Sequence, residues 1–599
     1  MTVLSIQNRG FGCLPNNPVT GPASCRTASS SSYIGNGTQS LNGTRERFER
    51  ATNHFPFAAE LLEISTMWGG NALPSMMYGR ASAPRKRWNS QGEIEEVYLE
   101  DGMGFQLDGT YNAIEYLKTA NLLILDSNED GYEKLSVDKN LQQYLKERLL
   151  DSDLLRTRSL MLMCHLFPGN KEIEPFQRGV LGRLHLQPFQ SVVEYIPKLL
   201  EKKLLSTRQQ HEVIGTLLES STFSDRNWKF KALELADAML VTAPCDLLET
   251  YAAIRRKAVH RLVVGTIWKE PSHLLERLAT CPISNFLYWK WRLSRAEDCV
   301  HRDDFDAAVR EVFGYAAINP TKPSTLEYLL GKEVRFEHAR FVYLSGRFED
   351  AKILLDQELK AINYERSEKL HDSLVTYLAG VNCETGNTKE AVRLTKAVLA
   401  DSKEHSRSHV SLAEAYLHDG MTYCDPPTLF MDECARKKFS EAKIICEAVL
   451  QRYRSMPNFD TISGHDNIAK VDRINYLRVT TIMARISFIE VIFGGGDLSA
   501  ALNSWVAVFN AIEKCGWSEQ GFMEGISHLT MGAIYRCLDN TTESELHVKT
   551  ALNLLNGAGR RHLIVGLGAI WPEFTEEVRL RKGGRLTAVL NAELPKSKS

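Results

Sequence analysis

The residue types that could do chemistry gather in a few short clusters. His405 and His409 are four residues apart, a spacing that places two imidazoles on one helix face, as in zinc sites. No glutamate follows His405 as in an HExxH motif, and a zinc site needs three or four ligands, so we interpret this segment as a polar helix start. Asp303, Asp304 and Asp306 could hold a cation, but Asp at a turn commonly caps the next helix, and we favour that structural interpretation.

A glycine run and a basic run are the next candidates. Gly494 to Gly496, followed by Asp497, could approach a phosphate, but a lone glycine run is a weak signal and is more typical of a turn. Arg85–Lys86–Arg87 could contact nucleic acid or serve nuclear import, and we interpret it instead as a solvated loop. The aromatic group Tyr288, Trp289 and Trp291 is more typical of core packing than of a ligand site.

Motifs of known catalytic chemistry are missing from the sequence. It contains no GxSxG elbow and no GxxxxGK[ST] loop, whose glycines and lysine cradle a nucleotide phosphate. We therefore expect the protein not to be an enzyme, and we expect neither a cofactor nor a metal ion.

A pattern of small residues returns along the C-terminal half. A small residue is followed seven positions later by Gly or Asp, and Ala or Ser comes five positions after that. Small residues let two helices cross closely, so each unit predicts a helix, a tight turn and a second helix, and such units stack into a solenoid. The copies are Ala296, Asp303 and Ala308; Ala339, Gly346 and Ala351; Ala379, Gly386 and Ala391; Ala413, Gly420 and, after an insertion, Ala442; Ile489, Gly496 and Ala501; Gly532, Asp539 and Ser544.

Composition limits the class of protein. At 599 residues the chain is too long for one core, and its net charge of −2 gives no reason to expect general attraction to nucleic acid or anionic membranes. No run of eighteen apolar residues is present, so we expect no membrane partner. The 12 cysteines form no CxxC pair, which favours reduced thiols, and we expect a cytoplasmic protein.

The order of patterns predicts an all-α protein, a tetratricopeptide-like helical solenoid with an N-terminal winged-helix domain containing a small β-hairpin. Helical periods followed by an alternating pair of strands predict that winged helix. The expected divisions are a disordered Gly/Ser/Pro-rich segment at 1–44, the winged helix at 45–150, a helical spacer at 151–269, the repeats at 270–560 and a C-terminal tail at 561–599.

Three segments resemble the winged-helix region of fungal STAND proteins, which are NB-ARC or NACHT signalling ATPases with tetratricopeptide repeats. The segments are AAELLEISTMWGGNALPSMM, NAIEYLKTANLLIL and KLSVDKNLQQYLKERL. Two departures from the family text are Trp68-Gly69-Gly70 in place of an acidic turn and Asp138-Lys139 in place of His-Arg. The matching positions are Leu61, Leu62, Ile64 and Ser65; Leu73 and Pro74; Ala113, Leu117, Leu122 and Ile124; Leu135, Val137, Leu141 and Gln142.

The resemblance implies a regulatory or sensor module. We expect a non-catalytic scaffold that binds a protein or peptide partner in the repeat groove, and the sequence indicates no small-molecule ligand. Two alternatives stay open: the C-terminal part of a nucleotide-dependent switch whose NTPase domain is missing from this chain, and a winged-helix DNA-binding regulator. Nucleic acid is the less favoured partner, because the helix from Tyr111 to Ala120 offers Lys118 against Glu115 and the wing is acidic.

The tetratricopeptide pattern also predicts which residues face the groove. They lie six and three positions before the small residue of a first helix, and one and four positions after it. Arg and Tyr concentrate binding energy when desolvated, so Arg340 and Tyr343 are the first candidates for contact. The full set is Lys290, Leu293, Glu297, Val300, Glu333, Phe336, Arg340, Tyr343, Arg407, Val410, Glu414 and Leu417.

Overall fold

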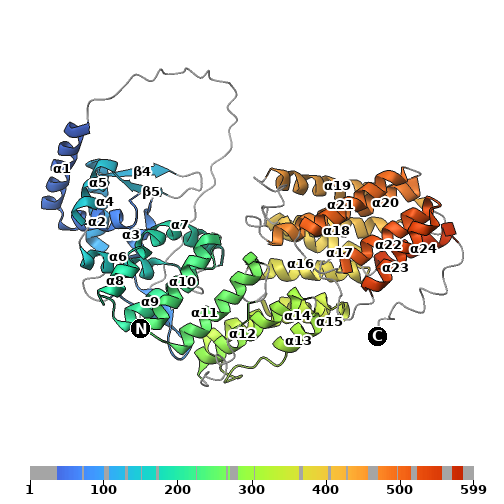
Figure 1. Ribbon diagram of the computed structural model, residues 1–599, viewed down its shortest axis with the longest axis horizontal. Helices are drawn as coiled ribbons and strands as arrows, with labels where there is room; N and C mark the ends of the chain where they lie inside the picture. The colour runs from blue at the N-terminus through green and yellow to red at the C-terminus, as the bar shows by residue number, and fades with distance from the viewer. Residues whose placement is uncertain are drawn as a thin grey trace, which may run out of the picture.

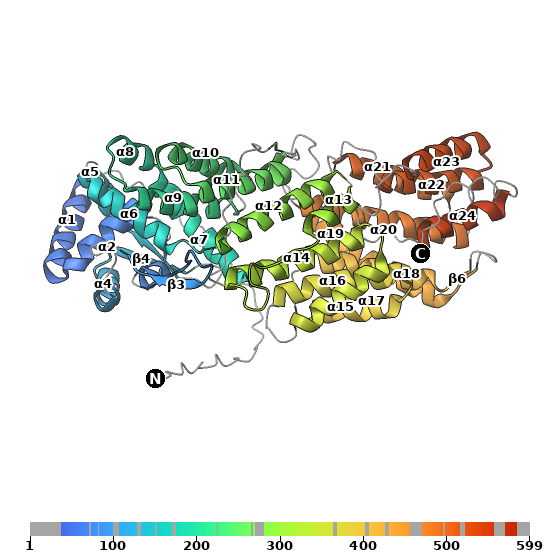
Figure 2. The same cartoon turned by 90° about the horizontal axis from the view of Figure 1, so that it is seen from below.

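A computed structural model gives the arrangement of the chain (Figures 1 and 2). It describes residues 37–583 apart from 71–72, 82, 100–106, 128–132, 150–151, 170–174, 224–225, 265–267, 270–280, 303, 363–367, 402–405, 426–429, 456–469, 495–496, 515–521 and 556–569. The structure is 78% helix with few strands, which confirms a mostly helical, solenoid-like protein.

The N-terminal half combines helices with two small sheets. Its helices are α1 (Gly37–His54), α2 (Pro56–Met67), α3 (Met76–Arg80), α4 (Leu107–Thr119), α5 (Lys139–Leu149), α6 (Asp153–Leu166), α7 (Pro175–Val193), α8 (Ile196–Glu201), α9 (Thr207–Ser220), α10 (Arg226–Thr242), α11 (Asp246–Val259) and the π-helix η1 (His260–Val264). Its strands are β1 (Leu73–Pro74), β2 (Arg85–Trp88), β3 (Ile94–Val97), β4 (Leu123–Ser127) and β5 (Glu133–Val137).

The strands form two separate antiparallel sheets. β4 and β5 make the hairpin that the alternating pattern predicts, and β1 pairs with β5, so the sheet order is β1-β5-β4. The second sheet is the hairpin β2–β3, in which Arg85 lies opposite Val97. The sequence interpretation missed this hairpin and took its first strand for a loop.

One hydrophobic core runs through the expected winged-helix region and the expected spacer. It extends from Phe48 in α1 to Val259 in α11, across the expected division at residue 150. Trp68 is buried at the end of α2 and its indole N–H donates to the carbonyl oxygen of Ser159 in α6 at 3.2 Å. Because the two regions share this core, they pack as one unit.

The C-terminal half consists of stacked helix hairpins, seen in green to red in Figure 1. Each hairpin is a first and a second helix, and each first helix from α12 to α18 contacts the next first helix. The pairs are α12 (Pro282–His301) with α13 (Phe305–Val312), α14 (Thr325–Leu344) with α15 (Phe348–Ile362), α16 (Glu368–Glu384) with α17 (Thr388–Asp401), α18 (Ser406–Met421) with α19 (Glu433–Arg454), α20 (Lys470–Gly494) with α21 (Leu498–Lys514), and α22 (Phe522–Cys537) with α23 (Thr541–Leu555). The short strands β6 (Cys424–Asp425) and β7 (Phe430–Met431) lie between α18 and α19.

The repeated small residues lie where the two helices of a hairpin cross. Ala308, Ala351, Ala391, Ala442 and Ala501 are all fully buried, and so are the small residues of the first helices that the structure describes. The turn positions explain the choice of Gly or Asp. Gly346, Gly386 and Asp539 have φ between 57° and 80°, the left-handed region that Gly, Asn and Asp enter at the least cost.

The two ends differ from the expected divisions. Helix α1 begins at Gly37, so residues 37–44 belong to a helix, and residues 1–36 lie outside the described residues. Within the expected tail, α24 (Ile570–Gly583) packs on α22, and its buried Trp571 donates to the hydroxyl of Thr530 at 3.0 Å. The solenoid therefore includes part of the tail, because α24 covers the apolar face of the last hairpin.

Candidate functional site

The structure buries part of the predicted partner groove. Tyr343 is only 1% exposed and its ring packs 5.9 Å from that of Tyr377 on α16. It cannot reach a partner, because the next first helix closes over it. The residues of the predicted set that are buried in this way are Leu293, Tyr343, Val410, Glu414 and Leu417.

Four other members of the set form what we call the charged row: Lys290 and Glu297 on α12, and Glu333 and Arg340 on α14. Their side chains are 19–39% exposed. Lys290 pairs with Glu333, and Arg340 pairs with Glu297 and with Glu337. The charged row therefore links two first helices while it still faces water, and these ion pairs already occupy the predicted contact residue Arg340.

Three members of the predicted set remain. Val300 and Phe336 are partly buried against the solenoid core, and the Phe336 ring lies 5.7 Å from that of Tyr377. Arg407 belongs to α18, but its side chain lies outside the described residues.

Further along the solenoid, the same helix face carries charges that are out of water. Glu414 on α18 pairs with Arg478 on α20 at 2.6 Å, and both side chains are at most 5% exposed. Burial raises the pKa of Glu414, and the nearby Arg478 and Arg485 oppose that shift. Burial lowers the pKa of His418 to about 3, and Arg485 adds to this effect. These groups hold helices together inside the protein and offer no surface for a partner.

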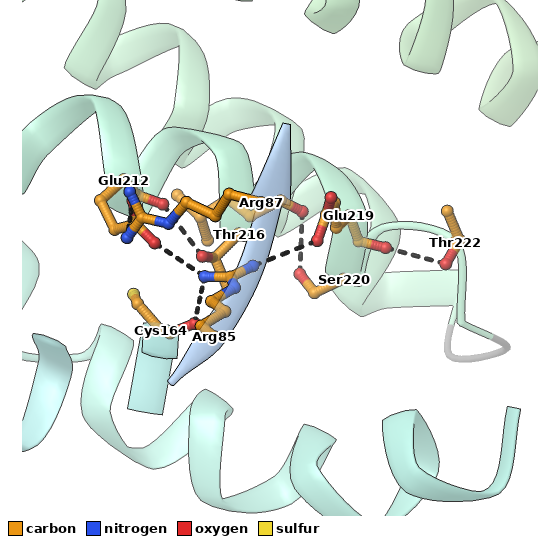
Figure 3. Close-up of polar contacts among 9 residues, drawn as sticks. Arg85, Arg87, Cys164, Glu212, Thr216, Glu219, Ser220 and Thr222 are labelled. Atoms are coloured by element: carbon orange, nitrogen blue, oxygen red, sulfur yellow. Dashed lines mark hydrogen bonds and ion pairs between the residues drawn. The ribbon is translucent and has the colours of Figure 1, made fainter. Parts of the chain in front are cut away.

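The basic run is a structural centre rather than a solvated loop. Arg85 lies on β2 with its side chain 7% exposed, and its Nη1 donates to the carbonyl oxygen of Cys164 at 2.6 Å and to Glu212 at 2.7 Å (Figure 3). Arg85 also pairs with Glu219 at 3.5 Å, and Arg87 pairs with Glu212 at 2.6 Å. Two arginines of the hairpin are thus held by two glutamates of α9.

A cavity of about 680 Å³ adjoins this centre, where the β2–β3 hairpin and helices α9, α11, α12 and α14 meet. We call it the junction cavity. Its charged lining comes from Arg87, Arg208, Glu212, Glu219 and Lys290. Its apolar wall is formed mainly by Leu247, Leu248, Tyr251, Ile283, Phe286 and Leu287. Lys290 belongs both to the cavity and to the charged row, so the two surfaces are continuous.

The remaining chemical clusters of the sequence are described only in part by the structure. His405, Asp303, Gly495 and Gly496 lie outside the described residues. Asp304 caps α13 by accepting from the amide of Ala307 at 3.0 Å, as a turn Asp is expected to do. Among the described residues, no group of three or more His, Cys, Asp or Glu side chains could hold a metal ion.

No protein-family model matches this chain, and no curated protein matches it either. In the part of the chain that the structure describes, no helix is long and apolar enough to cross a membrane.

The junction cavity was not found from the sequence. Its lining comes from segments between residues 87 and 326, and no local pattern connects them. The sequence did contain one signal of the hairpin. Residues 85–88 could form one strand, and Ile94 to Val97 could form a second strand. Read as a hairpin, those segments would have predicted a strand in place of a solvated loop, although not the glutamates of α9 that pair with the arginines.

Proposed function

We propose that this protein is a non-catalytic regulatory scaffold that binds a segment of a protein partner along the first helices of its solenoid. The solenoid is similar in plan to tetratricopeptide repeats, and the N-terminal unit is similar to a winged helix. A relation to STAND signalling proteins remains part of this proposal and rests on the resemblance of the segments quoted above.

The strand order supports the winged-helix part. β1 lies between α2 and α3, and β4 and β5 follow α4, while the sheet order is β1-β5-β4. A helix, a strand, two helices and a closing hairpin is the order expected of a winged helix, and in this chain the β2–β3 hairpin is inserted between the second and third of these helices. The described helix α4 carries Lys118 paired with Glu115 at 2.8 Å, so it adds no free positive charge for DNA phosphates.

The observation that carries the proposal is the charged row on α12 and α14. The same face is buried further along, at Glu414 and Arg478, whereas here its charges keep contact with water. Charges arranged in a fixed pattern on a rigid helical surface favour recognition of a complementary charged segment. Solenoids present such surfaces over several repeats.

A photo-crosslinking residue at Phe336 tests the proposal. It lies between Glu333 and Arg340 on the same helix, so a partner on the charged row should crosslink there. The matched control is Ile353 on the second helix α15, which is 57% exposed. The partner is then purified and its dissociation constant measured directly. Equal crosslinking at both positions would contradict the proposal.

A charge exchange separates recognition from stability. Lys290→Glu with Glu333→Lys keeps the internal ion pair but reverses both charges that a partner meets. We expect the double variant to fold as the wild type does and to bind the purified partner at least about tenfold more weakly, since like charges brought together across an interface are unfavourable and tenfold corresponds to about 1.4 kcal/mol. Unchanged affinity would show that the charged row is not the partner surface.

The non-catalytic part of the proposal has its own test. A nucleotide site needs backbone amides at a helix start, a lysine on the phosphates and a hydroxyl for Mg²⁺. No sequence motif assembles these groups, so we expect millimolar ATP-Mg²⁺ to leave the melting temperature unchanged. A ligand at a hundred times its dissociation constant would add about 2.7 kcal/mol. A clear upward shift, or ATP hydrolysis, would favour the alternative of a nucleotide-dependent switch.

A further inference from the structure

We propose that the junction cavity is a binding site for a small amphipathic anion, a molecule with an apolar body and one acidic group such as a carboxylate or phosphate. This site would bind a small molecule, whereas the charged row would bind a protein segment, although the two surfaces meet at Lys290. A volume of about 680 Å³ lies within the range of pockets that bind small molecules. The apolar wall, which includes Leu248 and Phe286, would cover the body of the ligand.

The balance of charge at the cavity favours an anion. Glu212 and Glu219 are matched by Arg85 and Arg87, and Lys290 is matched by Glu333. Arg208 remains: it is exposed, lines the cavity, and forms no ion pair with any residue that the structure describes. The pKa of Arg87 is lowered, first by burial, and the positive charges of Arg85 and Arg208 add to this effect while Glu212 opposes it. An anion entering the cavity would relieve that repulsion.

The starts of four helices also lie at the cavity. Thr207, Leu247, Ile283 and Leu326 line the cavity, and each belongs to the first turn of a different helix, namely α9, α11, α12 and α14. The start of an α-helix carries partial positive charge. The starts of α9 and α14 are capped by Ser206 and Ser324, and α11 and α14 carry acidic residues in their first turns, so Arg208 is the charge that carries the preference for an anion. Four helix starts and an unmatched arginine therefore surround one mostly apolar space.

Two fluorescent probes with the same carbon skeleton test this inference on the full chain. 8-Anilinonaphthalene-1-sulfonate carries one anionic group, and N-phenyl-1-naphthylamine carries none. We expect the sulfonate to bind at one saturable site and more tightly than the neutral probe. Displacement by 1-naphthoate and by 1-naphthyl phosphate then shows whether a carboxylate or a phosphate is preferred.

Variants assign the binding to the cavity. Arg208→Gln should weaken the sulfonate about fivefold, the upper end for an exposed ion pair, and leave the neutral probe unchanged. Leu248→Trp should fill the cavity and weaken both probes. The matched control is Arg454→Gln, an exposed arginine at the end of α19, which should change neither affinity.

The contradicting outcomes are equally specific. Equal affinity for the two probes, no saturable site, or an unchanged sulfonate affinity in Arg208→Gln would each overturn the inference. Melting curves check that every variant is folded, and Arg208→Gln gives a clear answer even if Leu248→Trp fails to fold. Because Arg208 lies outside the charged row, its variant should leave partner crosslinking at Phe336 intact, so the two proposals fail separately.

Discussion

Glu414 and Arg478 form an ion pair that is almost completely removed from water, which makes it costly to break. Removing one partner leaves the other charge buried and unpaired, so Glu414→Gln or Arg478→Met should each lower the free energy of unfolding by about 3–5 kcal/mol. Replacing both, with Glu414→Met and Arg478→Met, should restore most of the loss. Urea denaturation of the full chain measures each change.

An exposed pair provides the control for that prediction. Arg393 and Glu390 on α17 are 67% and 44% exposed, so Arg393→Met should cost less than about 1 kcal/mol. Equal effects at the two pairs would show that burial is not what makes the Glu414–Arg478 contact important.

The histidine pair between α22 and α23 predicts a pH dependence. The Nδ1 atoms of His528 and His547 lie 2.7 Å apart, so the N–H of one ring donates a hydrogen bond to the other ring. Burial, and then His547, lowers the pKa of His528 to about 4, while burial lowers the pKa of His547 and Glu543 opposes that shift. The unfolded chain therefore binds protons more readily between about pH 6.5 and pH 4.

The sign of the effect follows directly. The stabilisation is complete above about pH 6.5 and is lost as the pH falls towards 4. We expect the melting temperature of the wild type to fall over this range more steeply than that of His528→Gln. His371→Gln, a substitution at a more exposed histidine, serves as the control and should keep the wild-type slope. A wild-type slope in His528→Gln would rule out the pair as its source.

At the scale of elements, helix crossings depend on residues without a large side chain. A Cβ atom at Gly532 would lie 2.9 Å from Cγ2 of Val548 and 3.2 Å from the backbone oxygen of Ser544 on α23. Gly532→Ala should therefore force α22 and α23 apart and cost about 1–3 kcal/mol. Gly215, inside α9, has nothing within 4 Å of its Cβ position, so Gly215→Ala should stabilise by up to about 1 kcal/mol. Thermal unfolding measures whether each variant is less or more stable than the wild type.

The same elements show how far the sequence could predict the structure. The helix hairpins followed from small residues and turn glycines because both requirements are local. The β2–β3 hairpin could not be predicted in this way, because Arg85 pairs with Glu212, which lies 127 residues further along the chain. A basic run whose acidic partners lie far away in the sequence is more readily interpreted as exposed to solvent. The groove positions were assigned from the pattern of one repeat, but the burial of Tyr343 depends on the next helix, α16, which a single repeat does not contain.

For the whole molecule, the positions of the hydrophobic cores predict two cooperative units. One core extends from Phe48 to Val259 and the other from Trp289 to Val578. Between them lies a small cluster of Ile254, Leu287 and Trp291. Beside this cluster, the β2–β3 hairpin contacts α14. The backbone N–H of Leu326 donates to the carbonyl oxygen of Gly92 at 3.1 Å, and the hydroxyl of Thr325 donates to the carboxylate of Glu93 at 2.5 Å. Asp298 on α12 also pairs with Lys257 on α11 at 2.7 Å and with Arg261 on η1 at 2.9 Å. Even with these ion pairs, the contacts between the two cores are few compared with those inside either core.

Calorimetry of the full chain should therefore show two unfolding transitions, because so small a junction cannot make two large cores unfold together. Arg85→Met removes the buried arginine that joins β2 to α9 and should lower only the transition of the N-terminal unit. Glu414→Gln should lower only the transition of the solenoid. Lys86→Met, at the exposed neighbour of Arg85 on β2, should move neither. A single transition that both Arg85→Met and Glu414→Gln displace would mean that the junction couples the two units far more strongly than its contacts indicate. In that case a ligand in the junction cavity would stabilise the whole chain against unfolding, and not only the contact between the N-terminal unit and the solenoid.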